Sequence, residues 1–168
     1  QFIGRLRVLD IRLSQEYIQK TEAQYYVLEE SDVRSRLLHR DDFAHKGNMG
    51  NALIVAGSYG MSGAAILATR ACLRSGVGKV TVHTPKKNYG VMQISIPEAV
   101  LHMDHEETAF TEAVDTDGFD ALGIGPGLGC QETTAIAMIA QIRRAQCPIV
   151  ADADALNILA SHRAWMQQ

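Results

Sequence analysis

The sequence has few of the residues that mark disulfide-rich, metal-binding or membrane-spanning proteins. Its 168 residues include three cysteines, and they form no CxxC pair or Cys/His spacing typical of a zinc site. An odd number of cysteines without such a spacing favours reduced thiols in a cytoplasmic protein. No apolar run approaches the roughly 18 residues that a membrane-spanning helix needs. The first residues also lack the order of charged, apolar and small residues that defines a signal peptide.

An excess of positive charge is also absent. The formal net charge is −3 and the pI is about 6.1, so there is no electrostatic reason to expect nucleic acid or an anionic membrane as a partner. Nucleotides stay possible, because backbone N–H groups bind phosphate without a basic surface. With 46% apolar residues, 21% charged residues and four prolines, the composition is that of a globular chain long enough for one domain.

Strand and helix patterns alternate over most of the chain. Residues 4–13 predict a short strand with partial alternation, and residues 14–42 predict a polar linker with a short helix near 30–39. The remaining chain predicts strands alternating with helices: strands at 52–56, 79–83, 120–124 and 148–151, and helices at 62–75, 88–95, 132–145 and 155–162. Ser62 is expected to cap the first of these helices. The alternation predicts an α/β layered fold with a largely parallel sheet.

Two glycine-rich segments each join an expected strand to an expected helix. They are GSYGMSG at 57–63 and GIGPGLG at 123–129. At the carboxyl end of a parallel sheet, glycines let the backbone approach a ligand, and the following helix offers N–H groups and a positive dipole end. Neither segment matches a P-loop or the dinucleotide fingerprint. The alternatives are a tight turn for the first and a flexible connection for the second, although Pro126 stiffens the latter.

Acidic residues follow the last expected strand. Asp152 and Asp154 could hold a hydroxyl, a ribose or, through water, Mg²⁺. A helix-capping role is the alternative for Asp154, so Asp152 is the better candidate for a ligand contact. The pair His45–Lys46, followed by glycine, could contact a phosphate, with a structural role near a turn as the alternative. No metal-site grouping of histidines and no Ser/His/Asp or Cys/His arrangement can be defended, so these patterns name no catalytic base.

Taken together, these segments resemble one family. In order and approximate spacing, the NAD(P)H-hydrate dehydratases have motifs similar to HKGNMG, AGSYGMSGAA, LRSGVGKVTV, PEA, GIGPGLG and DADALN, which begin here at residues 45, 56, 73, 97, 123 and 152. The resemblance runs from about Arg40 to the end of the chain. Residues 1–13 resemble the tail of the epimerase domain that precedes the dehydratase in bifunctional bacterial enzymes, with Arg12 where a glycine is expected. The resemblance thus divides the chain into that tail, a linker at 14–42 and the N-terminal part of a dehydratase domain at 43–168.

The resemblance implies a three-layer α/β/α ribokinase-like fold and a role in nicotinamide-nucleotide repair in the cytoplasm. In this reaction (S)-hydrated NADH or NADPH is dehydrated at the expense of ADP in the bacterial type or ATP in the eukaryotic type, with Mg²⁺. The expected steps are phosphorylation of the ring hydroxyl and elimination of phosphate. Carried over by motif, Gly63 and Ala64 are expected to line the hydrated-nicotinamide site, and Gly125 and Gly127 to form its facing wall. Asp152 and Asn157 are expected nearby as further substrate-binding residues.

The family's remaining motifs do not occur before Gln168. These are a TPH segment, a lysine-glycine nucleotide-binding loop and a GTGD-like segment with the catalytic aspartate and an anion hole. We therefore expect no catalytic residue and no metal ligand in this chain, a fold truncated at its C-terminus, and no activity of the chain alone. The longer protein is expected to be a homo-oligomer. The alternatives are a ribokinase-like kinase of a small heterocyclic alcohol and a truncated domain without catalysis.

Overall fold

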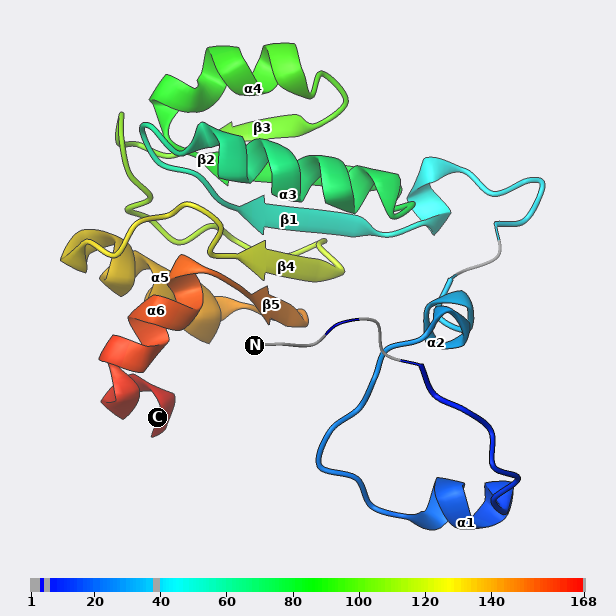
Figure 1. Cartoon of the computed structure of the whole chain (residues 1–168). Coiled ribbons are helices and arrows are strands. Elements are labelled where there is room, and N and C mark those ends of the chain that lie inside the picture. The colour runs from blue at the N-terminus through cyan, green and yellow to red at the C-terminus, as the bar shows by residue number, and fades with distance from the viewer. Residues whose placement is uncertain (1–3, 5–6, 38–39, 168) are drawn as a thin grey trace. The chain divides into compact units, whose positions relative to one another are not determined.

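The computed structural model of the chain describes residues 4, 7–37 and 40–167. It divides the chain into two compact units, residues 1–40 and residues 41–168. In the first unit the regular elements among the described residues are α1 (Gln15–Lys20) and α2 (Glu30–Arg34), shown in Figure 1. The further division into an epimerase tail and a linker stays a prediction.

The expected strand at 4–13 is wrong over residues 7–13, which have no regular structure; residues 5 and 6 lie outside the described residues. A strand needs a hydrogen-bonded neighbour, and the sheet in the described part of the chain contains only strands of the second unit. Side chains that alternation would bury are exposed instead, such as Val8 and Ile11.

The linker contains one helix that was expected and one that was not. α2 begins where expected but ends at Arg34, and residues 38 and 39 of the expected helix lie outside the described residues. α1 was missed, although Ser14 is its N-cap and accepts the Tyr17 N–H at 3.4 Å. A Lys20–Glu16 ion pair at 2.6 Å adds support at i, i+4 spacing.

The second unit is built on a five-stranded sheet in which every neighbouring pair is parallel. Its order is β3-β2-β1-β4-β5, with bounds Asn51–Val55 (β1), Lys79–Thr84 (β2), Val100–Met103 (β3), Ala121–Ile124 (β4) and Ile149–Ala151 (β5). Four of these strands were predicted from their apolar runs. β3 was missed, because it is a short edge strand whose residues alternate between exposed and half-buried.

The helices match the expected ones to within one or two residues at each end. They are α3 (Ser62–Arg74), α4 (Tyr89–Ser95), α5 (Glu132–Arg144) and α6 (Asp154–Ser161), with short 3-10 helices at Lys46–Asn48, Lys86–Asn88 and Arg163–Gln167. The expected cap at Ser62 is wrong: Met61 is the N-cap of α3, and Ser62 is its first helical residue.

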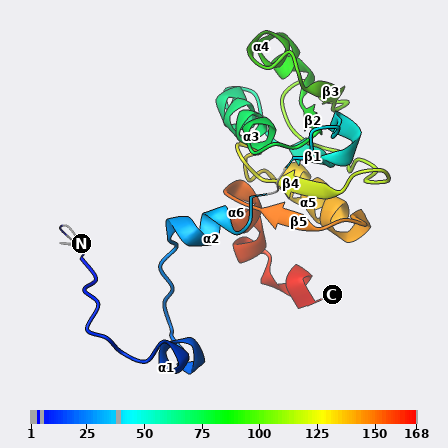
Figure 2. The ribbon, with the colours of Figure 1, turned by 90° about the vertical axis from the view of Figure 1, so that its right-hand side faces the viewer.

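The sheet separates two apolar cores, so the unit has three layers (Figures 1 and 2). On one face Ile54, Val80 and Val82 pack with residues of α3 and α4. On the other face alternate strand residues such as Leu53 and Leu122 pack with α5 and α6. This is the period of two that a strand buried on both faces requires, and it confirms the α/β/α expectation.

Two further expectations concern cysteines and membranes. All three cysteines are free thiols, as the odd number and spacing predicted. Within residues 4, 7–37 and 40–167, no helix combines the length and the apolarity that a bilayer crossing requires.

Candidate functional site at the carboxyl edge of the sheet

Loops leave β1, β4 and β5 at the same edge, where these parallel strands end. The loops at 56–61, 125–131 and 152–153 lead into α3, α5 and α6. Because β1, β4 and β5 are neighbours in the sheet, the loops lie side by side (Figure 1). Ligands bind at this edge in open α/β sheets, where helix N-termini present their N–H groups.

The two glycine-rich loops contact each other directly. The Gly57 N–H donates to the Pro126 carbonyl at 2.8 Å. Gly127 has a φ of +67°, and a Cβ at this position would meet the Ala64 Cβ at 2.8 Å. The structure therefore packs Gly127 against Ala64 in the first turn of α3, whereas the resemblance placed these two residues on facing walls.

Gly125 makes an equally close contact with the end of β5. Its φ is +129°, and a Cβ here would overlap the carbonyl oxygen of Asp152. The Asp152 N–H in turn donates to the Ile124 carbonyl at 3.1 Å. Backbone packing thus explains the glycine at 125, and it brings Gly125 and Asp152 together.

Gly63 is different, because no atom lies within 4 Å of where its Cβ would be. It is exposed and is the second residue of α3, so its open side adjoins a helix N-terminus. No packing contact accounts for the absent side chain. Of the predicted glycines, this one leaves space that a ligand could fill.

The acidic residues after β5 differ in their partners. Asp152 is exposed at the sheet edge. Asp154 accepts the Gly129 N–H at 2.8 Å through Oδ2, and the Asn157 side-chain amide at 3.2 Å through Oδ1. The interpretation of Asp154 as a helix cap is wrong: Ala153 is the N-cap, and the Asp154 carboxylate anchors the second glycine-rich loop instead.

A cavity of about 400 Å³ opens beside the two glycine-rich loops. Its lining is partly polar and comprises Ser58, Tyr59, Met61, Thr108, Ala109, Leu128, Gly129 and Gln131. The Tyr59 N–H donates to the Thr108 carbonyl at 2.8 Å, and the Lys87 Nζ lies 4.9 Å from the centre of the Tyr59 ring. Thr108, Ala109 and Lys87 were missed, because their place at this edge depends on contacts between segments distant in the sequence.

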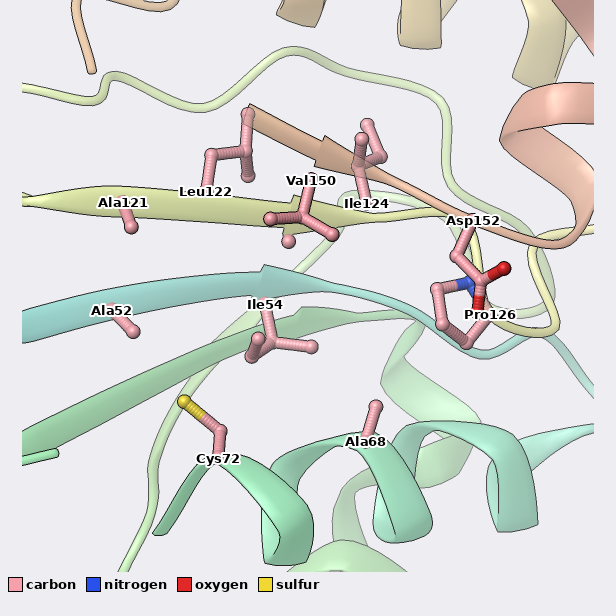
Figure 3. A pocket seen from close by; sticks show the side chains of 11 residues that line it. Ala52, Ile54, Ala68, Cys72, Ala121, Leu122, Ile124, Pro126, Val150 and Asp152 are labelled. Carbon is pink, nitrogen blue, oxygen red and sulfur yellow. The ribbon is translucent and has the colours of Figure 1, made fainter. Parts of the chain in front are cut away.

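A second, mostly apolar pocket of about 280 Å³ lies on the α3 face of β1, β4 and β5. Figure 3 shows Ala68 and Cys72 of α3 facing Ile54 and Val150 across it. Asp152 and Pro126 lie together at one end of this pocket, which places the predicted ligand-contacting carboxylate on its rim.

The HKGNMG motif lies at the opposite, amino edge of the sheet. The His45 Nδ1 accepts the Gly47 N–H at 3.0 Å. The Lys46 carbonyl occupies the space where a Cβ of Gly78 would be, and the Gly78 N–H donates to the Met49 carbonyl at 2.9 Å. The motif therefore holds the entries to β1 and β2 together, which is the structural alternative considered from the sequence.

Among the described residues, this edge of the sheet has neither a reactive thiol nor a cluster of side chains arranged as metal ligands. Desolvation, and then the Asp154 carboxylate, raise the pKa of the Cys130 thiol, so it is not a ready nucleophile. Within the described ranges, no three His, Cys, Asp or Glu side chains come together as metal ligands.

A parallel sheet in three layers, with glycine-rich loops packed at its carboxyl edge, defines an open α/β protein. A ribokinase-like superfamily protein from Enterococcus faecalis has the same fold, with a TM-score of 0.69 at 24% identity over 85% of this chain and 52% of that one. The NAD(P)H-hydrate dehydratase family model matches residues 52–168, and the chain belongs to this family.

Individual relatives agree. The ADP-dependent (S)-NAD(P)H-hydrate dehydratase of Bacillus subtilis is 38% identical over 127 residues, which cover 76% of this chain and 45% of that protein. The bifunctional NAD(P)H-hydrate repair enzyme of Moorella thermoacetica is 35% identical over 94% of this chain and 31% of its own length. A Bacillus subtilis dehydratase co-crystallised with ATP and Mg²⁺ superposes with a TM-score of 0.67 at 36% identity, covering 76% of this chain and 46% of that one. The chain thus spans less than half the length of these relatives.

Proposed function

We propose that this chain provides the substrate-binding half of an ADP-dependent (S)-NAD(P)H-hydrate dehydratase, which restores hydrated NADH or NADPH. The observation that carries the proposal is the pair of glycine-rich loops packed against each other beside an open cavity. Family membership gives the reaction class. The open side of Gly63 supports an approach of the hydrated nicotinamide ring to the start of α3.

The other predicted residues take supporting positions in this proposal. Gly125 and Gly127 allow the three loops to pack closely, and they thereby fix the shape of the wall that faces the substrate. Asp152 offers an exposed carboxylate at the same edge, and Asn157 reaches the loop through Asp154. We assign these residues to binding and orientation, and we assign no proton transfer to any of them.

ADP, or ATP, with Mg²⁺ would supply the phosphoryl group that turns the ring hydroxyl into a leaving group. Mg²⁺ is usually held by one or two carboxylates together with phosphate oxygens and water. Asp152 is the carboxylate at this edge whose exposure fits that use. Phosphoryl transfer depends chiefly on positioning and charge stabilisation, so rigid loops are the contribution expected from this part of the enzyme.

The proposal is tested by the recovery of reduced-nicotinamide absorbance from (S)-hydrated NADPH with Mg²⁺ and ADP. The chain is assayed alone and mixed with the C-terminal portion of the Bacillus subtilis relative that it does not match. We expect activity in the mixture and none with either part alone. Phosphorylation of a thiazole alcohol without NADPH recovery would replace the proposal with a small-molecule kinase. No reaction in any mixture, while the parts form a complex, would favour a non-catalytic domain.

A matched pair of variants tests the site itself. Gly63→Leu and Gly90→Leu both place a large side chain at the second position of a helix, where nothing lies within 4 Å. Both variants should therefore stay folded. We expect Gly63→Leu to weaken the binding of NADPH about tenfold or more, which is about 1.4 kcal/mol, while Gly90→Leu leaves binding unchanged. Equal affinities in the two variants would remove Gly63 from the site.

A further inference from the structure

A buried chain of hydrogen bonds links an exposed histidine on β3 to the loop beside the cavity. The His83 side chain on β2 is fully buried, and its Nδ1 lies 2.8 Å from the Nδ1 of His102, its partner in the register of β3. The His83 Nε2 lies 3.2 Å from the Oδ2 of Asp104, which is also fully buried. Neither the resemblance nor the proposed function uses these residues.

The Asp104 carboxylate organises the segment that follows it. Its Oδ1 accepts the Glu106 N–H at 2.9 Å and the Thr111 hydroxyl at 2.6 Å. Its Oδ2 accepts the Thr111 N–H at 2.7 Å and, at 3.4 Å, the Glu112 N–H. Burial alone would raise the pKa of Asp104, but these donors together with His83 hold it below its ordinary value of 3.8. The carboxylate is therefore ionised at neutral pH and can only accept.

The ionised carboxylate fixes the tautomers of both histidines. The His83 Nε2 must carry the proton that it donates to Asp104, so the neutral His83 ring has a bare Nδ1. That nitrogen can only accept, and the His102 Nδ1 must therefore carry a proton. Burial, despite Asp104, lowers the pKa of His83 and keeps it neutral.

The segment held in this way forms part of the cavity described above. Thr108 and Ala109 line the cavity, and the Thr108 carbonyl accepts the Tyr59 N–H of the first glycine-rich loop at 2.8 Å. In the same segment, the Glu106 and Glu107 carbonyls accept the Lys86 and Lys87 N–H groups at 3.2 and 3.1 Å. The segment is therefore held at one end by the buried Asp104 carboxylate, and its Thr108 contacts the first glycine-rich loop, which is proposed to contact the ligand.

We propose that Asp104, which sets the proton pattern of His83 and His102, is a positioning residue that holds residues 104–112 as the outer wall of the ligand cavity. It acts through the Thr108–Tyr59 contact and touches no ligand itself. Only the identity of the ligand rests on the proposed function. Among the charged groups around this cluster, Glu112 acts on the pKa of His83 and pairs with His105 at 3.0 Å, and the Lys86 Nζ donates to the His105 carbonyl.

The first test is spectroscopic and needs no ligand. Nitrogen-15 NMR of the histidine rings at neutral pH should show His83 protonated at Nε2 and His102 at Nδ1. In Asp104→Asn the amide oxygen can stay at the position of Oδ2, where the Thr111 and Glu112 N–H groups donate, and still accept from His83, so the tautomers should persist while the new NH2 group faces the Glu106 N–H. A wild-type His83 protonated at Nδ1 would overturn the proposal.

The second test measures the wall and the ligand together, with NADPH as the probe. In Asp104→Asn we expect faster hydrogen exchange at the Tyr59 and Thr111 amides and NADPH binding weakened about tenfold. Asp115→Asn is the matched control, because Asp115 also accepts the N–H two residues on, that of Asp117 at 3.1 Å, but at the surface. Asp115→Asn should leave both amides and the affinity unchanged.

His102 provides variants that leave the buried groups intact. His102→Gln keeps a donor for His83 and should keep the wild-type affinity and exchange, whereas His102→Leu removes the donor and should weaken NADPH binding. If Asp104→Asn and His102→Leu bind NADPH as wild type does, the proposal is wrong. If wild type does not bind NADPH while Tyr59 still loses protection in Asp104→Asn, the proposed function fails and the wall assignment stands.

Discussion

Three glycines of the second glycine-rich loop have left-handed backbones but very different surroundings. Gly125 and Gly127 have φ values of +129° and +67°, and a Cβ on either would collide with Asp152 or Ala64. Gly129 has a φ of +79° and no atom within 4 Å of its Cβ position. Replacing each of the three by alanine therefore distinguishes the free-energy cost of a left-handed backbone from the cost of steric overlap.

We expect Gly129→Ala to lower the free energy of unfolding by about 1–2 kcal/mol, the cost of a left-handed residue with a side chain. Gly125→Ala should lower it by about 2–5 kcal/mol, because overlap with Asp152 adds an overpacking cost. Gly127→Ala should have an effect nearer that of Gly125→Ala. Urea denaturation of the three variants measures the order. Equal losses in all three would mean that the contacts with Asp152 and Ala64 do not constrain the loop.

At the scale of elements, the contact between His83 and Asp104 joins β2 to the segment after β3. Because both side chains titrate, the stability of this contact depends on pH. Burial lowers the pKa of His83 below its ordinary 6.5. As the pH falls below about 6.5, the unfolded chain therefore takes up a proton that the folded chain still excludes, and stability falls. The lowered pKa of Asp104 acts in the same direction, but only as the pH falls below its ordinary 3.8.

The expected result is a free energy of unfolding that is highest above pH 7 and falls between about pH 6.5 and 5. One excluded proton contributes a slope of at most about 1.4 kcal/mol per pH unit. His83→Gln should be less stable at neutral pH but show a shallower slope, and His105→Gln, at an exposed position, should keep the wild-type slope. Urea midpoints at several pH values measure this. A wild-type slope in His83→Gln would exclude His83 as its source.

Most elements could be predicted because their signals are local. The buried run of β1 and the small-residue face of α3 each lie within one short window, and the glycine-rich loops follow from such windows. The strand expected at 4–13 failed because alternation cannot supply a neighbouring strand, and β3 was missed because an edge strand needs no apolar run.

The site could be predicted as far as its loops and no further. Gly125 and Asp152 lie together, because chain order along a parallel sheet brings both to one edge. The roles of Asp154 and Thr108 depend on partners distant in the sequence, Gly129 and Tyr59 respectively. Contacts between residues so far apart produce no periodic pattern in the sequence, so a single sequence does not reveal them.

At the scale of the whole molecule, an apolar sheet face stays open between α3 and β5. Val150 is 68% exposed there and lines the pocket in Figure 3. Exposed apolar patches of this kind bind apolar molecules. We expect a fluorescent apolar dye to bind the chain and Val150→Lys to remove most of the signal. Leu67→Lys is the matched control, because Leu67 is 70% exposed but lies outside the pocket. Equal dye signals in the two variants would place the dye elsewhere.

The distribution of the apolar core over the chain predicts where proteolysis begins. Both core clusters are built from residues between Leu53 and Trp165. Described residues before position 38 are all exposed, including Lys20 and Arg34. Trypsin should therefore cut first at such positions in residues 7–37, because exposed backbone with few packed contacts opens at little cost.

Mass spectrometry identifies the cuts, and calorimetry compares the trimmed product with the intact chain. We expect a product that begins after the cut and keeps the Tm of the intact chain, because no core residue is lost. First cleavage at Lys79 in β2 would show that the sheet opens more readily than residues 7–37. A clearly lower Tm after trimming would show that the removed residues stabilise the sheet.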